Sequence, residues 1–249
     1  MRVAIDLQGI QNSGNSLRGI GRYSTALVKN LIQSFPDDEY ILMSNGYMTN
    51  ISSIFEDELT SERLNVSYSS WYLPEVKEIS LDSLKFHYLI AEQLYSYSFS
   101  RLDSDIILIT SFFDRPDHNC YVTFDKGYDL PPILTIFYDL IPLIYPEEYL
   151  DCNPSFKNFY HSRLKKINEI DGLLAISNST LLEAKQHLEK DFKILKNISS
   201  GCNQELFNQD TSSFSKLSES INGNKYILYV GAADPRKNLS RLIDAYSRI

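Results

Sequence analysis

The sequence predicts an α/β fold with a mainly parallel, Rossmann-like sheet. Short apolar runs such as 106–109 and 133–137 are typical of strands that are buried on both faces. They alternate with longer segments, such as 81–97, in which apolar residues recur at helical spacing. With 249 residues, 43% of them hydrophobic, the chain can bury a sizeable core. This alternation indicates repeated strand–helix–strand units.

Each expected element follows from one of these two patterns. Apolar and β-branched runs predict the strands 2–7, 40–44, 66–69, 106–109, 133–137, 172–176 and 193–198. Apolar residues three and four apart predict the helices 23–33, 81–97, 156–170 and 181–188. Thr180 and Glu183 have the spacing of a capping box at the start of the last of these helices.

A serine-rich, weakly patterned stretch over 211–224 divides the chain. It predicts a Rossmann-like first domain over 1–200 and a linker over 201–225. Beyond it, 226–230 is predicted to be a buried strand, and apolar residues over 239–246 recur at helical spacing. One strand and one helix cannot bury both faces of a sheet. Residues 226–249 are therefore expected to be the truncated opening of a second Rossmann-like domain.

Composition excludes several classes of protein. The net charge of −8 argues against a nucleic-acid partner. The three cysteines and four histidines are scattered without ligand spacing, which predicts free thiols, a reducing compartment and no metal site. The sequence enters a strand directly, without a signal peptide, and has no apolar run near the roughly 20 residues that span a bilayer. We expect a cytoplasmic protein.

A glycine-rich segment, 14–24, lies between the first strand and the first helix. Glycines let the backbone approach a ligand, and a helix N-terminus offers free N–H groups to an anion, so Gly19 and Gly21 are candidate binding residues. The dinucleotide fingerprint G-x-G-x-x-G fits poorly because it follows its strand at once, which disfavours an NAD-linked oxidoreductase. A flexible loop with a glycine at the helix start is the alternative.

Tyr138 and Asp139 directly follow the apolar strand 133–137. In open parallel sheets, ligands bind at the carboxyl ends of the strands, so these two residues are candidates for the reacting site. The alternative is that Asp139 only caps the turn that follows.

Two sets of cations are further candidates. Arg236 and Lys237 precede the last helix, where the helix dipole disfavours cations, so an anion bound beside them is one interpretation and solvated surface charge the other. A basic helix could touch the inner face of an anionic membrane, although a solvated face is the default. Its cations are Lys157, Arg163, Lys165 and Lys166.

Five groups of residues, in their order along the chain, resemble the motifs of a known family. They are 19–23, 139–142 with 145–147, 175–179, 201–203 before Phe207, and 226–238 with 244–246. The family is glycosyltransferase family 4, retaining enzymes of the GT-B fold that use sugar nucleotides. Within it, the resemblance is to mannosyltransferase-like enzymes that build bacterial surface polysaccharides.

The resemblance implies two Rossmann-like domains, with the acceptor on the N-terminal side and the sugar nucleotide mainly on the C-terminal side. By it, Gly19 and Gly21 lie near the donor phosphates and sugar. Asp139 faces the transferred sugar. Tyr138 stands where many relatives have His, and its hydroxyl donates a hydrogen bond but is a poor base near neutral pH.

The same resemblance gives Lys237, with Arg236, the task of neutralising the diphosphate. Such fixed cations would stabilise the transition state, because the leaving diphosphate gains charge as the glycosidic bond breaks.

The predicted function is therefore transfer of a sugar, with mannose favoured, to a glycan or lipid-linked acceptor in surface polysaccharide synthesis. The donor is GDP-mannose ahead of a UDP-sugar, with no cofactor. The family's two-glutamate donor motif would fall beyond residue 249, so this chain alone is expected to be inactive. The truncated second domain would expose an apolar face that favours self-association. The alternative is a non-catalytic half that binds a glycan or a partner enzyme.

Overall fold

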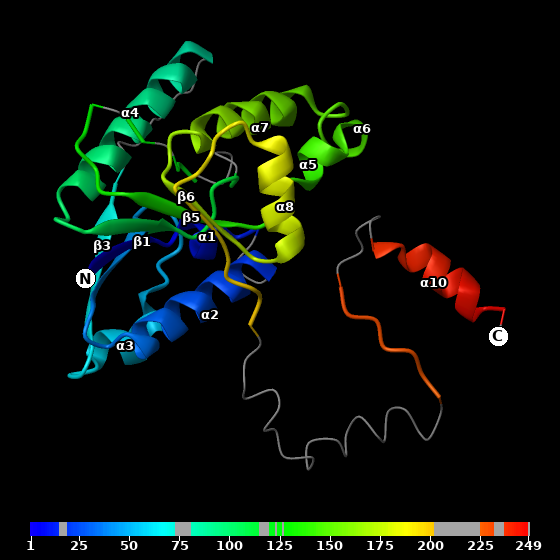
Figure 1. Cartoon of the computed structure of the whole chain (residues 1–249), viewed down its shortest axis with the longest axis horizontal. Coiled ribbons are helices and arrows are strands. Elements are labelled where there is room, and N and C mark those ends of the chain that lie inside the picture. Colours follow the sequence, from blue (N-terminus) through cyan, green and yellow to red (C-terminus); the bar gives the residue numbers. More distant parts are fainter. Residues whose placement is uncertain are drawn as a thin grey trace. The chain divides into compact units, whose positions relative to one another are not determined.

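The computed structural model describes residues 1–14, 19–72, 81–114, 120–122, 124–125, 127–201, 225–231 and 237–248; in the helix that begins at Leu81, side chains are described from residue 86. The chain forms two compact units, Met1–Gly201 and Cys202–Ile249. Figure 1 shows the course of the chain through both.

In the described residues of the first unit, seven strands form one sheet in the order β3-β2-β1-β4-β5-β6-β7, and every neighbouring pair is parallel. The strands are β1 Arg2–Asp6, β2 Glu39–Asn45, β3 Asn65–Trp71, β4 Ile106–Ile109, β5 Ile133–Phe137, β6 Gly172–Ala175 and β7 Ile194–Asn197. This confirms the predicted α/β fold with a Rossmann-like parallel sheet. All carboxyl ends of the strands consequently lie along one edge.

The order of the strands reverses beside β1. The chain passes outward from β1 to β2 and β3, and then crosses to β4 on the other side of β1. At such a switch point, the connections leave β1 and β4 in opposite directions, which opens a crevice at the carboxyl edge.

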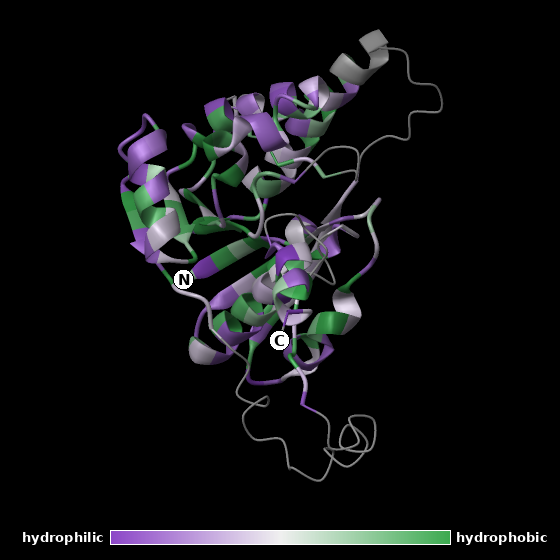
Figure 2. Cartoon of the chain, turned by 90° about the vertical axis from the view of Figure 1, so that its right-hand side faces the viewer, coloured by the Kyte–Doolittle hydropathy of each residue, from purple (hydrophilic) through white to green (hydrophobic). Residues whose placement is uncertain are grey.

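Two apolar layers cover the sheet, because side chains alternate between its faces along each strand. On one face, Ala91, Tyr95 and Phe99 pack with Ile107 and Ile109. On the other, Val28 and Ile32 pack with Ile5 and Leu108. Figure 1 shows the helices α4 (Leu81–Ser100) and α7 (Pro154–Ile167) over the first face, and α2 (Gly19–Ser34) and α3 (Glu56–Thr60) over the second. In Figure 2, hydrophobic residues concentrate in the strands of the sheet.

The helical segments of this unit include short turns at the edge as well as the long covering helices. They are α1 Gln8–Gln11, α2 Gly19–Ser34, η1 Ser52–Phe55, α3 Glu56–Thr60, α4 Leu81–Ser100, α5 Ile141–Ile144, α6 Pro146–Tyr149, α7 Pro154–Ile167 and α8 Asn178–His187.

Two details of the predicted helices are wrong. Helix α2 begins at Gly19 and not at residue 23, because tertiary packing, which buries Gly21 and Ser24, outweighs the low helix propensity of glycine. The N-cap of α8 is Ser177, whose hydroxyl accepts from the N–H of Thr180 at 3.1 Å. Glu183 does not close a capping box with Thr180; its carboxylate accepts from the N–H of Leu140 at 3.2 Å.

The described part of the second unit contains one helix, α10 Leu239–Tyr246, as the spacing predicts. Residues 225–230 have no regular secondary structure, so the strand expected over 226–230 is not formed, and Leu228 and Val230 are 76% and 86% exposed. A single strand without neighbours gains no ladder of backbone hydrogen bonds. Apart from its two end residues, the predicted linker over 201–225 lies outside the described residues.

Gly172 provides a test of how tightly the sheet is packed. A Cβ atom at this position would lie 2.6 Å from Cδ2 of Leu134 and 2.8 Å from the carbonyl oxygen of Ile194. Because that oxygen is backbone of β7, it cannot swing away. We expect Gly172→Ala to lower the free energy of unfolding by about 1–3 kcal/mol, measured by denaturant titration. Gly201→Ala is the control, since nothing lies within 4 Å of its added Cβ. Equal stability of the two variants would contradict this packing.

Candidate functional site

The candidate site lies at the carboxyl edge of the sheet, where Tyr138 and Asp139 follow β5. The hydroxyl of Tyr138 lies 2.7 Å from Oγ of Ser24 on α2 and 3.2 Å from the carbonyl oxygen of Thr110 after β4. Oγ of Ser24 lies 3.4 Å from the same carbonyl oxygen. Two hydroxyls therefore share one backbone acceptor, which joins α2, β4 and β5.

Tyr138 is half-buried, and this burial raises the pKa of its hydroxyl well above the usual value, against the smaller lowering effect of the Ser24 hydrogen bond. The phenol stays protonated across the neutral range, so it can donate a hydrogen bond but cannot act as a base. This agrees with the expectation that the hydroxyl of Tyr138 donates a hydrogen bond and is a poor base near neutral pH. A contact between Tyr138 and a sugar stays a prediction.

Asp139 has a structural role in the turn. Its Oδ1 accepts from the N–H of Ile141 at 3.0 Å, at the start of α5. Its charge is also felt by Tyr160, whose pKa is raised first by burial and then by the carboxylates of Asp139 and Glu183. The turn cap that was the alternative interpretation is thus present, and the role of Asp139 toward a sugar stays a prediction.

The first turn of α2 carries Gly19 and Gly21 at the same edge. Gly21 is buried, whereas an added Cβ on Gly19 would meet nothing within 4 Å. The first N–H groups of a helix have no partner inside it, so this turn can receive an anion or a sugar hydroxyl. The ring of Tyr23 packs edge-to-face on that of Tyr138 at 5.9 Å, and its hydroxyl donates to the carbonyl of Ser199 at 2.8 Å.

The cations predicted for the diphosphate belong to the second unit. Lys237 is exposed just before α10, and Arg236 lies outside the described residues. In the first unit, Arg22 is exposed in the first turn of α2, next to Gly21. The predictions did not assign a role to Arg22, although it falls within the glycine-rich segment.

A buried polar network beside this site was missed by the sequence analysis. The carboxylate of Asp6, at the end of β1, accepts from the hydroxyl of Tyr95 at 2.5 Å, and from the backbone and side-chain nitrogens of Gln8 at 2.8 and 2.9 Å. Burial raises the pKa of Asp6 to about 6, although these hydrogen bonds lower it. The signal in the sequence was a carboxylate at the end of an apolar strand, followed by Gln8 and Gln11 among apolar residues.

Helix α1 extends the network across the edge. The side chain of Gln8 donates to the carbonyl of Tyr121 at 2.8 Å and accepts from the N–H of the same residue at 2.9 Å. The side-chain nitrogen of Gln11 donates to the carbonyls of Asn45 and Thr49 at 3.0 and 2.9 Å. The loops after β1 and β2 are therefore fixed to one another.

The basic helix α7 does not present the expected surface. Arg163 is buried, donates to the carbonyl of Val122 and lies against the rings of Phe112 and Phe159. Both interpretations of this helix, a solvated face and a membrane-facing surface, are wrong for Arg163, because the apolar residues on its helix face turn it toward the sheet.

Of the other cations of α7, Lys165 is exposed and two form ion pairs. Lys166 pairs with Glu92 at 2.7 Å and with Glu169 at 3.4 Å, and Lys157 pairs with Asp151 at 2.7 Å. In the ranges that the structure describes, no helix has the length and apolar composition to cross a membrane.

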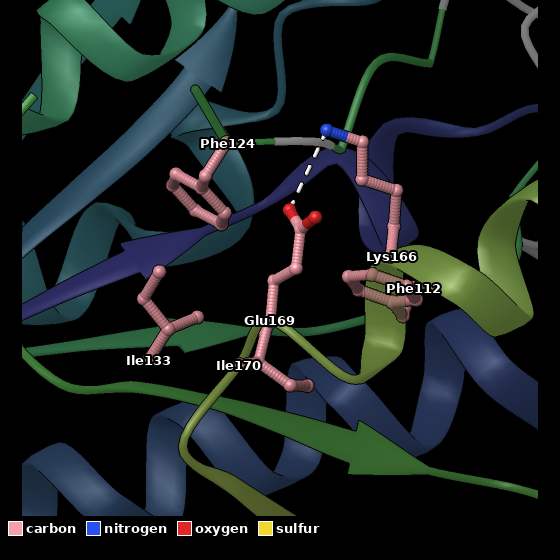
Figure 3. A pocket seen from close by; sticks show the side chains of 6 residues that line it. All are labelled: Phe112, Phe124, Ile133, Lys166, Glu169 and Ile170. Carbon is pink, nitrogen blue, oxygen red and sulfur yellow. Dashed lines mark ion pairs between the residues drawn. The ribbon is translucent and has the colours of Figure 1, made fainter. Parts of the chain in front are cut away.

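A small crevice lies away from the carboxyl edge, beside the start of β5. Figure 3 shows its walls and the Lys166–Glu169 ion pair. Its lining residues are Phe112, Phe124, Ile133, Lys166, Glu169 and Ile170. Its volume of about 10 Å³ is at the lower limit for one water molecule, so it is no site for a sugar.

Comparison with known proteins gives relatives of one kind. The chain is 28% identical, over 254 aligned residues, to the serotype-specific mannosyltransferase WbdA of Escherichia coli, an alignment that covers 99% of this chain and 30% of that protein. A second relative of the same name and organism is 30% identical over 63% of this chain and 20% of its own length. The chain thus spans less than a third of these relatives. No family model matches it.

Among solved structures, a UGT transferase from Siraitia grosvenorii in complex with UDP aligns with a TM-score of 0.43 at 12% identity, over 88% of this chain and 54% of that one. UGT89C1 of Arabidopsis thaliana, complexed with UDP, gives 0.46 at 12% identity, over 92% and 57%. Similarities at this level bear on neither the fold nor the ligand of this chain.

The raised pKa of Asp6 predicts a pH dependence of stability. The folded state binds this proton more tightly than the unfolded chain does, so the contribution of Asp6 to the free energy of unfolding falls as the pH rises from about 4 to about 6. A shift of about two pKa units corresponds to up to about 3 kcal/mol.

The measurement is denaturant unfolding of wild type and Asp6→Asn across this pH range. The difference between them should change with pH, whereas Asp37→Asn, at an exposed carboxylate, should follow wild type. A constant difference between wild type and Asp6→Asn would show that Asp6 titrates normally.

Proposed function

We propose that this chain supplies the acceptor side of a retaining glycosyltransferase of the GT-B, family 4 type. The observation that carries the proposal is the similarity to a mannosyltransferase along 99% of the chain. The donor is a nucleotide-diphospho-sugar, with GDP-mannose ahead of UDP-sugars. The acceptor is a glycan or a lipid-linked glycan in surface polysaccharide synthesis.

The carboxyl edge of the sheet supports this chemistry. The hydroxyl of Tyr138, whose own proton is engaged by Thr110 or Ser24, can accept a hydrogen bond from a sugar hydroxyl, and the first turn of α2 offers backbone N–H groups to the phosphates and hydroxyls of the two substrates. Asp139 would face the transferred sugar. Lys237, with Arg236, would neutralise the diphosphate as its charge grows in the transition state.

We place the enzyme in the cytoplasm, where nucleotide sugars serve as donors, and at the inner face of the membrane if the acceptor is lipid-linked. The ion pairs of α7 give no support to attachment through that helix. Self-association through the second unit is supported by its exposed apolar residues, among them Leu228 and Val230.

A second candidate is a non-catalytic half that binds a glycan or a partner enzyme. It is favoured by the turn cap of Asp139, which gives this carboxylate a structural reason to be present. A measurement of sugar transfer distinguishes the two candidate functions, because only the glycosyltransferase requires turnover.

The central test compares sugar transfer by variants and wild type, in a form of the protein whose turnover can be measured. Lys237→Ala should lower kcat/KM by about 10- to 150-fold, because loss of one charge-assisted phosphate contact costs about 1.5–3 kcal/mol in the transition state. The thermal stability should stay within about 0.5 kcal/mol of wild type, since Lys237 is exposed. Lys225→Ala, at another exposed lysine of the same unit, is the matched control. An unchanged kcat/KM would show that Lys237 is only surface charge.

The 249-residue chain by itself should release little nucleotide from labelled GDP-mannose or UDP-sugars. Closing donor and acceptor together in a fixed geometry is worth up to roughly 7–11 kcal/mol, and this chain spans less than a third of the relatives that it matches. The assay measures free nucleotide and labelled glycan, with the Escherichia coli relative as positive control. Sustained turnover by the chain would overturn this expectation.

A further inference from the structure

Two exposed tyrosines lie side by side at the carboxyl ends of the outer strands. Tyr72 follows β3 and is 64% exposed, and Tyr47 follows β2 and is 45% exposed. Their ring centroids are 6.4 Å apart at an interplanar angle of 69°, an edge-to-face contact. We call Tyr47 and Tyr72 the tyrosine pair.

The backbone beneath the tyrosine pair is fixed by hydrogen bonds. The N–H of Gly46 donates to the carbonyl of Trp71 at 2.8 Å, and the N–H of Tyr47 donates to Oδ1 of Asn45 at 3.0 Å. The buried side chain of Gln11 accepts from the N–H of Asn45 at 2.8 Å and donates to two carbonyls of the same loop. These bonds pre-organise the loop, so a ligand would not have to order it.

The ring of Tyr72 packs against Gly46. A Cβ atom on Gly46 would lie 2.0 Å from Cε1 and 2.5 Å from Cζ of Tyr72. The ring of Tyr72 therefore lies directly against the backbone of Gly46, in a space that any larger residue would fill. Together with the fixed loop, this gives two amphipathic rings in set positions at the surface.

We propose that the tyrosine pair is a distal binding site for a neutral, extended glycan. The face of an aromatic ring is electronegative and attracts the polarised C–H groups on the faces of sugar rings, while the phenol hydroxyls can exchange hydrogen bonds with sugar hydroxyls. Tyrosine provides this contact area at a low cost in conformational entropy. The net charge of −8 favours an uncharged over an anionic ligand.

The distance between the tyrosine pair and Tyr138 determines how long a ligand must be to reach both. Tyr138 follows β5, which is four strand intervals from β3 and three from β2, so at about 4.8 Å each Tyr72 lies about 19 Å and Tyr47 about 14 Å along the edge. A glycan of several sugar units would reach both places, whereas a mono- or disaccharide would not. The proposal rests on the proposed function only in that it takes this glycan to be the acceptor chain.

The experiment measures glycan binding without any donor, so that it does not depend on turnover. Linear α-linked manno-oligosaccharides, from mannobiose to mannohexaose, are titrated into the purified chain by calorimetry. Trp71, the single tryptophan, precedes Tyr72 and is buried, and its fluorescence is recorded in the same titration as a second readout. We expect the affinity of wild type to rise with the length of the oligosaccharide.

Three substitutions test the tyrosine pair. Tyr72→Ala and Tyr47→Ala should each weaken mannohexaose binding at least about tenfold, about 1.4 kcal/mol. Gly46→Ala should also weaken binding, because it keeps both tyrosines but displaces the ring of Tyr72. The matched control is Tyr97→Ala on α4, since Tyr97 is 51% exposed and makes a similar edge contact with Tyr128 at 6.3 Å.

Binding by wild type that depends on length, is lost in the three variants and is unchanged in Tyr97→Ala supports the proposal. No binding by a wild-type chain of native circular dichroism overturns it, as does an equal loss in Tyr97→Ala. Self-association that disappears in Tyr72→Ala without any glycan binding would also overturn it, because the pair would then be a protein contact. Glycan binding together with failed turnover of longer forms would refute the proposed catalysis and leave this site intact.

Discussion

The buried carboxylate of Asp6 organises the carboxyl edge. It lies where the strand order reverses, and it accepts hydrogen bonds from Tyr95 on α4 and from Gln8 on α1. A carboxylate without water needs such partners, because leaving a buried charge unpaired costs several kcal/mol. These hydrogen bonds hold α4, which covers one face of the sheet, and α1, at the carboxyl edge, in a single arrangement.

Thr110 connects this network to the candidate site. Its Oγ1 donates to the carbonyl of Asp6 at 2.7 Å, and its own carbonyl accepts the hydrogen bond of Tyr138. The position of the Tyr138 hydroxyl thus depends on the pairing of β1 with β4. The loop that carries Tyr47, at the other end of the carboxyl edge, also depends on Asp6. Asp6 binds Gln8, Gln8 and Gln11 belong to the same short helix, and the side chain of Gln11 fixes that loop.

The sheet was predictable because its strands are buried on both faces, so 106–109 and 133–137 appear in the sequence as unbroken apolar runs. The start of α2 was not, since Gly19 and Gly21 are poor helix formers that tertiary packing brings into the helix. Helix α1 and its buried glutamines follow no apolar period. Arg163 looked like surface charge, and only the fold shows the carbonyl and aromatic rings that surround it. A local sequence pattern is enough to identify apolar strands and helix faces. The burial of a polar side chain depends on hydrogen-bond partners that are distant in the sequence, so the local pattern does not reveal it.

The charges of the first unit suggest how work is divided in the proposed enzyme. Arg163 is buried and Lys166 is paired with two glutamates, so neither is available for a diphosphate. At its carboxyl edge this unit presents uncharged groups beside the charges of Arg22 and Asp139: the protonated hydroxyl of Tyr138 and the tyrosine pair at the outer strands. These uncharged groups suit neutral sugars, because they offer hydrogen bonds and ring faces without the cost of desolvating a charge. In the proposed enzyme, neutralising a nucleotide diphosphate therefore falls to cations other than Arg163 and Lys166, and Lys237, which is exposed, is the described residue proposed for it.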